Sequence, residues 1–449
     1  MARLFGTDGV RGLANVDLTA PLALELGEAA ARLTIQGRPA SGHKPKAIIG
    51  RDTRISGEFL DHALAAGLAS AGMDVVRVGV VTTPTVAHLT ASSSVDLGVM
   101  ISASHNPMPD NGIKFFAHGG YKLPDQVEDQ IQELLNTSWD RPTGAAVGEV
   151  EYDDDWAEKS YIEHLMASLG TDLHGLRIAV DCANGGASFL APEAFRQAGA
   201  DAVVINAAPD GRNINDKAGS THPEQLQALT VASEADFGVA YDGDADRCLA
   251  VDRHGNLVDG DKIMGALAVH MRDEGQLAKD TLVVTVMSNL GLILAMQEAG
   301  IKTIQTGVGD RYVLEAMLEG GYSLGGEQSG HIIAKKYATT GDGILSSLLL
   351  ARMVKESGRD LADLTSFIKR LPQTLINVGG VDRSRASTDP AVQEAVAAAE
   401  AVLGNTGRVL LRPSGTEPLV RVMVEAATQS QADGVASRLA DVVKENLAL

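Results

Sequence analysis

Three aspartates occupy alternate positions in the segment DGDADR, residues 242–247, directly after an apolar stretch that is typical of a strand. In an extended or turning loop, Asp242, Asp244 and Asp246 could bring three carboxylates to one Mg²⁺. The segment is not an EF-hand, because the glycine and the glutamate that such a loop needs are both replaced by arginine. A solvated acidic turn is the alternative. The guanidinium of Arg247 could bind a phosphate beside the metal.

A single serine, Ser104, ends another apolar strand in the segment ISASHNPMPDNGIKFF, residues 101–116. We expect this serine to be exposed, with small neighbours that let a ligand approach. A serine at the end of a strand can carry a phosphoryl group, with His105 and Lys114 as candidates for charge stabilisation or proton transfer. The local sequence also fits a serine that caps a turn.

The segment RPSGTEP, residues 412–418, combines a guanidinium, two hydroxyls and a glycine in an expected turn between strands. These groups can form a phosphate site without the lysine of a Walker motif, although Pro-Ser-Gly is also an ordinary turn. The candidate phosphate ligands are Arg412, Ser414, Gly415 and Thr416 in the turn and Arg421 on the following strand.

The segment GGEQSGH, residues 325–331, places a carboxylate, an amide, a hydroxyl and an imidazole on a loop flanked by glycines. Glu327, Ser329 and His331 therefore suit the recognition of neighbouring sugar hydroxyls, and a loop without a ligand explains the same residues. Together with the metal and phosphate loops, this segment favours a phosphosugar as the ligand, with Ser104 as the phosphoryl carrier.

Two further arginines stand among glycines and aspartates, Arg11 in FGTDGVRG and Arg51 in GRDTR. Both could face the same cleft as the loops described above. Both could instead pair with neighbouring acids, which is the common role of an arginine near a carboxylate.

Short β-branched runs alternate with longer helical stretches along most of the chain, which predicts an α/β fold with parallel or mixed sheets. The strand ends VDLGVMISAS and ADFGVAYDGD share Asp-x-Gly-Val, which indicates related units, each with a ligand loop at a strand's carboxyl end. The last segment differs: a strand, a long helix over 387–403, paired strands and a terminal helix predict a smaller α+β domain. The expected domains are 1–152, 153–254, 255–371 and 372–449.

The composition excludes several classes of protein. Lysine and arginine total 38 against 58 acidic residues, a formal charge of -20 with no basic run, which argues against nucleic acid or an anionic membrane as a partner. Cys182 and Cys248 are the only cysteines, too few for a disulfide framework and without zinc-ligand spacing. No apolar signal core and no uninterrupted apolar stretch of about 18 residues is present, so we expect a cytoplasmic protein.

In this order, SASHNP, DGDADR, GEQSGH and RPSGTEP resemble the hallmark loops of the α-D-phosphohexomutase family, and the resemblance covers essentially the whole chain. It implies four domains around a central cleft, three related mixed α/β domains and a C-terminal α+β domain. It also implies that Ser104 is the phosphoserine and binds Mg²⁺ with the three aspartates. Glu327 and Ser329 match the ligands of the sugar hydroxyls, and the RPSGTEP residues with Arg421 match the site of the non-reacting phosphate.

Within that family, FGTDGVRG, NPMPDNGIKFF and Gln328 resemble the bacterial members that act on glucosamine phosphates. The resemblance implies that glucosamine 6-phosphate and glucosamine 1-phosphate interconvert through a 1,6-bisphosphate, supplying amino-sugar precursors for cell-wall synthesis. Glucosamine or glucose 1,6-bisphosphate would be the activator, and glucose or mannose phosphates are the alternative substrates. The segment GVGDRY departs from the glucose and mannose members, because it lacks a histidine that is sometimes proposed there as a proton carrier. The acid–base role therefore stays open between Lys114, Arg11 and His331. The oligomeric state is also open, a homodimer being one candidate.

Two other classes of protein fit part of the pattern. A haloacid-dehalogenase-like phosphatase would use Asp242 as its nucleophile, but that class has threonine or valine where Asp246 stands, and it leaves SASHNP unexplained. A phosphosugar sensor would bind the ligand without turning it over. The presence of Ser104, Lys114 and all three aspartates argues against the sensor.

Overall fold

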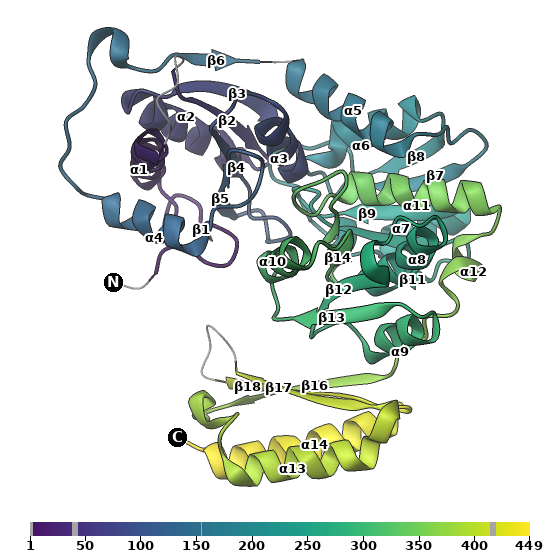
Figure 1. The fold of residues 1–449 in the computed structure, drawn as a ribbon. Coiled ribbons are helices and arrows are strands. Elements are labelled where there is room, and N and C mark those ends of the chain that lie inside the picture. Colours follow the sequence, from purple (N-terminus) through teal and green to yellow (C-terminus); the bar gives the residue numbers. More distant parts are fainter. Residues whose placement is uncertain (1–2, 38–43, 154, 414–418) are drawn as a thin grey trace. The chain divides into compact units, whose positions relative to one another are not determined.

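The computed structural model describes residues 3–37, 44–153, 155–413 and 419–449 (Figure 1). The chain divides into two compact units. The first comprises Met1–Met287 with Ile301–Ser366, and the second comprises Ser288–Gly300 with Phe367–Leu449.

The first sheet of the larger unit is mixed and six-stranded, in the order β1-β5-β4-β2-β3-β6. Its strands are β1 (Val10–Leu13), β2 (Lys46–Arg51), β3 (Asp74–Val80), β4 (Leu97–Ile101), β5 (Asp110–Ala117) and β6 (Val150–Tyr152). Strand β4 is buried along its whole length, which is why it reads as an uninterrupted apolar run. The helices of this region are α1 (Ala20–Gly37), α2 (Ile55–Ser70), α3 (Thr83–Ser92) and α4 (Asp125–Leu134), and α1 packs on α2 (Figure 1).

Two more mixed sheets complete the larger unit. One has the order β11-β10-β9-β7-β8, with β7 (Arg177–Asp181), β8 (Asp201–Ile205), β9 (Phe237–Tyr241), β10 (Cys248–Asp252) and β11 (Leu257–Val258). The other has the order β13-β12-β14-β15, with β12 (Thr281–Thr285), β13 (Lys302–Thr306), β14 (Leu324–Gly326) and β15 (Ile332–Ala334). Since β11 pairs with β10, the second sheet runs beyond the limit expected at residue 254.

The remaining helices of the larger unit lie along the chain between these strands and after them. They are α5 (Trp156–Leu169), α6 (Ala187–Gln197), α7 (Glu224–Ala232), α8 (Gly260–Asp273), α10 (Asp310–Gly320), α11 (Gly343–Ser357) and α12 (Leu361–Thr365). Among the described residues, no helix combines the length and the apolar character that crossing a membrane requires.

The smaller unit has the α+β architecture that the sequence predicts. Its antiparallel sheet has the order β16-β18-β17, with β16 (Gln373–Gly379), β17 (Arg408–Pro413) and β18 (Leu419–Glu425). Helices α13 (Pro390–Leu403) and α14 (Gln429–Leu447) cover one face of it (Figure 1). The helix expected from residue 387 begins at Pro390, because the Asp389 side chain caps it and a proline suits the first turn.

One helix from the middle of the chain, α9 (Leu290–Glu298), also belongs to the smaller unit. The fully buried carboxylate of Glu425 accepts hydrogen bonds from the backbone N–H of Leu290 and from Asn289, at 2.8 and 3.2 Å. Arg408 Nε lies 2.8 Å from the same carboxylate. These buried contacts attach to β18 a helix that the sequence assigned to the third domain.

Candidate active site

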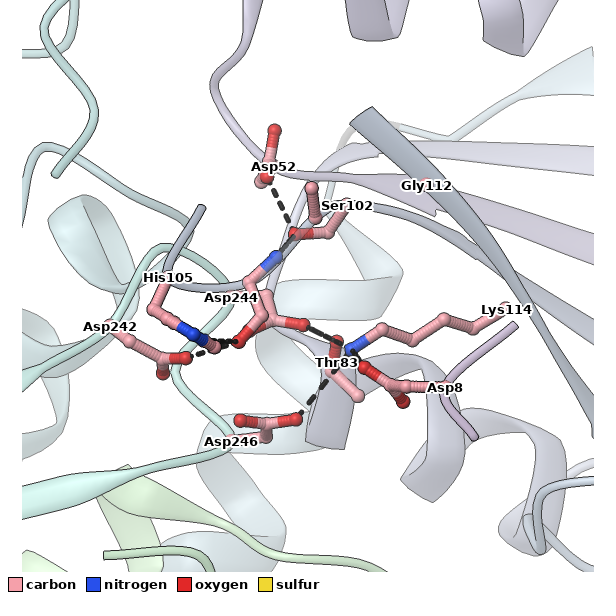
Figure 2. A network of polar contacts seen from close by, with 12 residues as sticks. Asp8, Asp52, Thr83, Ser102, His105, Gly112, Lys114, Asp242, Asp244 and Asp246 are labelled. Atoms are coloured by element: carbon pink, nitrogen blue, oxygen red, sulfur yellow. Dashed lines mark hydrogen bonds and ion pairs between the residues drawn. The ribbon is translucent and has the colours of Figure 1, made fainter. Parts of the chain in front are cut away.

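Ser104 lies in the loop that follows β4 and is the centre of the site. Its φ of +54° lies in the left-handed region, where non-glycine residues are uncommon and often functional. The expectation that this serine is exposed is wrong: Ser104 is only 1% exposed. The reason is a contact from a distant part of the chain, since its Oγ donates a hydrogen bond of 2.5 Å to Oδ2 of Asp242 (Figure 2).

A buried hydrogen-bond relay holds the backbone of Ser104 in this conformation (Figure 2). The N–H of Ser104 donates to Oγ of Ser102 at 2.9 Å, and that hydroxyl donates to Oδ2 of Asp52 at 2.6 Å. Both partners are fully buried, so the relay is shielded from water. The loop is therefore held from strands β4 and β2, which are neighbours in the sheet.

Arg54 fixes the rest of the same loop. Its fully buried guanidinium donates to Asp52 Oδ2 at 2.9 Å. It also donates to the carbonyl oxygens of Ser104, Asn106, Pro107 and Asp110, at 3.0, 2.8, 2.5 and 3.0 Å. The sequence pointed to Arg51 in this segment instead, whose Nε lies 3.9 Å from Asp61. The missed signal is the pair Asp52 and Arg54, two positions apart just beyond a strand.

Asp242, Asp244 and Asp246 converge after β9, as their spacing predicts (Figure 2). Each offers a carboxylate oxygen within 4.8 Å of the others, and all three side chains are buried, unlike those of a solvated turn. Oδ1 of Asp244 and Oδ1 of Asp246 are buried without a hydrogen-bond partner. Burial, and after it the charges of Asp246 and Asp244, raise the pKa of Asp242 well above its usual range. These carboxylate oxygens are hard ligands, and two of them have no hydrogen-bond partner, so the cluster fits a divalent cation such as Mg²⁺.

Lys114 reaches the aspartates from β5, where it is almost completely buried (Figure 2). Its Nζ lies 2.8 Å from Asp244 Oδ2, 3.0 Å from Asp8 Oδ2 and 3.6 Å from Asp246 Oδ2. Burial alone would lower the pKa of Lys114, but these carboxylates raise it well above its usual range. Burial alone would likewise raise the pKa of Asp244, but Lys114 and a 2.6 Å hydrogen bond from Thr83 lower it. Lys114 is thus a fixed positive charge beside the candidate metal site.

His105 lies between the serine and an arginine. Its Nδ1 is 3.4 Å from Ser104 Oγ and 3.1 Å from Nη1 of Arg247. Burial, and then the charges of Arg247 and Arg11, lower the pKa of His105 to about 4, so its imidazole is neutral near pH 7. Arg11 donates to the carbonyl oxygen of Ala103 at 3.2 Å. In addition to Arg54, the guanidinium groups of Arg11 and Arg247 therefore border the loop of Ser104.

A cavity of about 480 Å³ opens beside this loop, within the larger unit. It is bordered by six residues that the sequence selected: Arg11, His105, Asp246, Arg247, Glu327 and His331. Glu327 is held by the backbone N–H of Gly309, which donates to its Oε1 at 3.2 Å. His331 Nε2 accepts from the N–H of Gly341 at 3.2 Å, and its Nδ1 is buried without a partner. Ser329 is exposed and does not line the cavity.

The candidate phosphate ligands lie in the smaller unit. Arg412 on β17 and Arg421 on β18 are direct cross-strand partners. Burial, and then the charge of Arg421, lower the pKa of Arg412. Ser414, Gly415 and Thr416 lie outside the described residues.

Among the cavity residues that the sequence reasoning missed are Asp8, Lys122 and Asp310. Asp8 stands in FGTDGVRG, three residues before Arg11, and Asp310 stands in GVGDRY, the segment without a histidine. Lys122 follows Gly119, Gly120 and Tyr121 and belongs to no motif, so its place in the site depends on the tertiary structure.

Comparison with known proteins places these features in a known architecture. Profiles of phosphoglucomutase/phosphomannomutase match the chain as α/β/α domain I at residues 2–141, domain II at 159–255 and domain III at 259–371, and as the C-terminal domain at 375–442. They confirm the expected fold class of three related α/β domains and a different C-terminal domain. The domain limits given above stay a prediction.

Curated relatives match over the full length of both chains. The phosphoglucosamine mutase of Bifidobacterium animalis subsp. lactis is 60% identical over 454 residues, and that of Streptomyces coelicolor is 59% identical over 452, each with 100% of both chains covered.

Solved structures share the fold. A phosphoglucomutase/phosphomannomutase family protein from Burkholderia thailandensis has a TM-score of 0.82 at 25% identity, covering 99% of this chain and 97% of its own. The Aspergillus fumigatus N-acetylphosphoglucosamine mutase, solved with GlcNAc-6P and magnesium, has a TM-score of 0.70 at 20% identity, covering 99% and 96%.

Proposed function

Because the chain belongs to the phosphoglucomutase/phosphomannomutase family, we propose that it interconverts glucosamine 6-phosphate and glucosamine 1-phosphate. Members of this family are mutases, so the enzyme class is that of an isomerase. The substrate is supported by the full-length relatives named phosphoglucosamine mutase. The observation that carries the chemistry is the buried contact between Ser104 Oγ and the aspartate loop.

The reaction is a double phosphoryl transfer with Ser104 as the carrier. In the first step the P–Oγ bond of phosphoserine breaks and a P–O bond forms at O1 of glucosamine 6-phosphate, while the O1 proton leaves and Oγ gains one. The 1,6-bisphosphate turns over in the site. In the second step its P–O6 bond breaks and the P–Oγ bond forms again, while Oγ loses its proton and O6 gains one, and glucosamine 1-phosphate is released.

The metal is part of the proposal. Asp242, Asp244 and Asp246, with the phosphoserine, are the residues that would hold Mg²⁺, which offsets negative charge on the transferring phosphoryl group. The two buried carboxylate oxygens without partners support this assignment. A structural neighbour solved with magnesium is consistent with it.

The chain's own cations stabilise the transfer. Lys114 and Arg247 border the serine loop and the aspartates, so both can face the oxygens of a phosphoryl group on Ser104. Lys114 is held by the buried carboxylate of Asp244 at 2.8 Å, and Nε of Arg247 lies 3.9 Å from Oδ1 of Asp246. Proton transfer to and from the sugar hydroxyl stays open between Lys114, Arg11 and His331.

The sugar and its second phosphate need separate sites, because each phosphate in turn is the one that does not react. We propose Glu327 and Ser329 for the sugar hydroxyls. The cross-strand pair Arg412 and Arg421, with the other residues of the RPSGTEP segment, would hold the non-reacting phosphate. A cytoplasmic location completes the proposal, and the two buried free cysteines suit a reducing compartment.

A substrate panel tests the proposed reaction. The wild-type enzyme is assayed with the 6-phosphates of glucosamine, glucose and mannose, with Mg²⁺ and catalytic hexose 1,6-bisphosphate. We expect glucosamine 6-phosphate to lead by at least about tenfold in kcat/KM, about 1.4 kcal/mol, which one contact to the 2-amino group can supply. Equal or faster turnover of glucose or mannose phosphate would refute the substrate and leave the family chemistry standing.

A further inference from the structure

We infer that Asp8 is a positioning residue that holds Lys114 and Arg11 over the transferring phosphoryl group, and that Lys122 and Asp310 fix Asp8 from the sugar-binding side of the cavity. The inference rests on the phosphoryl transfer proposed at Ser104 and goes beyond it. Asp8, Lys122 and Asp310 would act through other side chains and need not touch the reacting atoms.

Asp8 lies opposite Lys114 because the backbone there allows a close approach. Gly9 has a φ of +78°, and a Cβ atom at this residue would stand 2.2 Å from the carbonyl oxygen of Ile113 and 3.2 Å from Cα of Lys114. Only glycine fits between this turn and β5. Oδ2 of Asp8 is consequently 3.0 Å from Lys114 Nζ, and the same oxygen pairs with the guanidinium of Arg11.

The other oxygen of Asp8 belongs to a bridge that ends at the sugar-binding loop. Nζ of Lys122 lies 2.5 Å from Asp8 Oδ1 and 2.5 Å from Asp310 Oδ2. Asp310 is the first residue of α10 and directly follows Gly309, whose N–H holds Glu327. Asp310 Oδ2 is also 3.6 Å from Nε2 of His331. The bridge thus joins the loop that carries Glu327 to the cation beside the aspartates.

The bridge is charged and largely shielded from water. The side chains of Asp8, Lys122 and Asp310 are 21, 11 and 15% exposed. Burial opposes ionisation of all three, yet the two carboxylates raise the pKa of Lys122 well above its usual range. Lys114 and Lys122 hold the pKa of Asp8 low, and Lys122 does the same for Asp310. Without Lys122, two partly buried carboxylates would lose their shared cation, and Asp8 would be free to shift with Lys114.

A neighbouring set of ion pairs provides a matched comparison. Arg311, the residue after Asp310, pairs with Asp125 on α4 and lies 3.3 Å from Glu128. Arg3 pairs with the same two acids. These contacts join α10 to α4 within the larger unit, and we call this place of contact the junction. They do not include Asp8 or Lys114. If Lys122 only held this junction together, loss of Asp125 would have the same effect.

The test compares Lys122→Met, Lys122→Arg, Asp310→Asn and Asp125→Asn with the wild type, using whichever hexose 6-phosphate the wild type turns over best. We expect Lys122→Met to lower kcat by at least about tenfold with KM changed less than about threefold, because charge alignment acts on the transition state. Lys122→Arg should recover most of the loss. Asp310→Asn, which retains the shape of the side chain but removes its charge, should also lower kcat. Asp125→Asn should keep kcat within about twofold of the wild type while lowering Tm.

Wild-type kcat in Lys122→Met, or in Asp310→Asn should the methionine variant fail to fold, would overturn the inference. So would an equal loss of kcat in Asp125→Asn, since the effect would then come from the junction. A wrong choice of sugar does not affect the comparison, whereas a wild-type chain that transfers no phosphoryl group would overturn both this inference and the proposed function.

Discussion

Oγ of Ser104 donates a 2.5 Å hydrogen bond to Oδ2 of Asp242, although 138 positions separate the two residues in the chain. Each residue follows the carboxyl end of a buried central strand, β4 and β9, in different sheets of the larger unit. The loops at these two strand ends therefore face each other, which is where open α/β sheets place ligands. A phosphoryl group on Ser104 would replace this hydroxyl contact and lie directly against the aspartate loop.

Replacing the serine tests its role as carrier. Ser104→Ala should abolish nearly all turnover, because no other described hydroxyl donates to the aspartate loop except that of Thr83, which Asp244 already holds. The free energy of unfolding should fall by about 1 kcal/mol, since a buried hydrogen bond to Asp242 is lost. Activity assays and urea unfolding measure the two effects.

Mass spectrometry of the wild type should find a phosphoryl group on Ser104 in a fraction that grows when a hexose 1,6-bisphosphate is added. A phosphate on another residue, or full activity in the alanine variant, would contradict the mechanism.

The chemical stability of the phosphoenzyme separates the proposed carrier from an aspartyl phosphatase. Enzyme labelled with a hexose 1,6-bisphosphate and then denatured should keep its phosphate in neutral hydroxylamine, because a phosphoserine ester does not react with that nucleophile while an acyl phosphate does. Release of the label would instead place the phosphate on an aspartate, with Asp242 as the first candidate. The matched sample is the same labelled protein in buffer without hydroxylamine.

The candidate chemistry was predictable from the sequence because it is local. DGDADR, SASHNP and GEQSGH each place several functional groups within a few residues at a strand end, and period-2 and period-3.6 patterns identify those strands and the helices between them. The same reasoning predicted helix α13 of the smaller unit. The helix begins at Pro390, three positions after the expected start at residue 387, because Asp389 caps it.

The rest of the site depends on contacts between distant segments. Ser104 is buried because Asp242 approaches from another sheet, which no local pattern indicates. Arg54 rather than Arg51 holds the serine loop, because the chain turns after β2 and directs the two side chains to different partners. Lys122 is connected to the site by its contacts with Asp8 and Asp310, which lie 114 and 188 positions away in the chain.

A stacked pair of histidines should make the protein less stable in acid. His88 on α3 and His164 on α5 have ring centroids 4.3 Å apart. Burial, and then His164, lower the pKa of His88 to about 4, and burial lowers that of His164. Both bind protons more weakly in the folded chain than in the unfolded one, where the pKa is about 6.5. Their contribution to stability is therefore complete above about pH 6.5 and is lost as the pH falls toward 4.

Urea unfolding at pH 7 and pH 5 measures this loss. Allowing for solvent screening of partly exposed rings, we expect the free energy of unfolding to fall by about 1–2 kcal/mol from this pair. In His88→Gln the pH-dependent part should shrink, while His174→Gln, an exposed histidine beside Asp172, should retain the full pH dependence. An unchanged slope in His88→Gln would assign the acid sensitivity to other groups.

Asp244→Asn tests the aspartate loop as a metal site. The substitution retains the size of a fully buried side chain but removes one of the three carboxylates and the main counter-charge of Lys114. We expect kcat with Mg²⁺ to fall by at least about a hundredfold, because metal affinity and the alignment of the ammonium are lost together. Calorimetric titration with Mg²⁺ should show weaker binding in the variant.

The matched control is Asp181→Asn, which changes another buried carboxylate at a strand end. Asp181 accepts hydrogen bonds from the backbone N–H groups of Ala183 and Gly219. That variant should lose stability and retain Mg²⁺ binding, whereas unchanged Mg²⁺ binding and activity in Asp244→Asn would make the loop a structural element instead of a metal site.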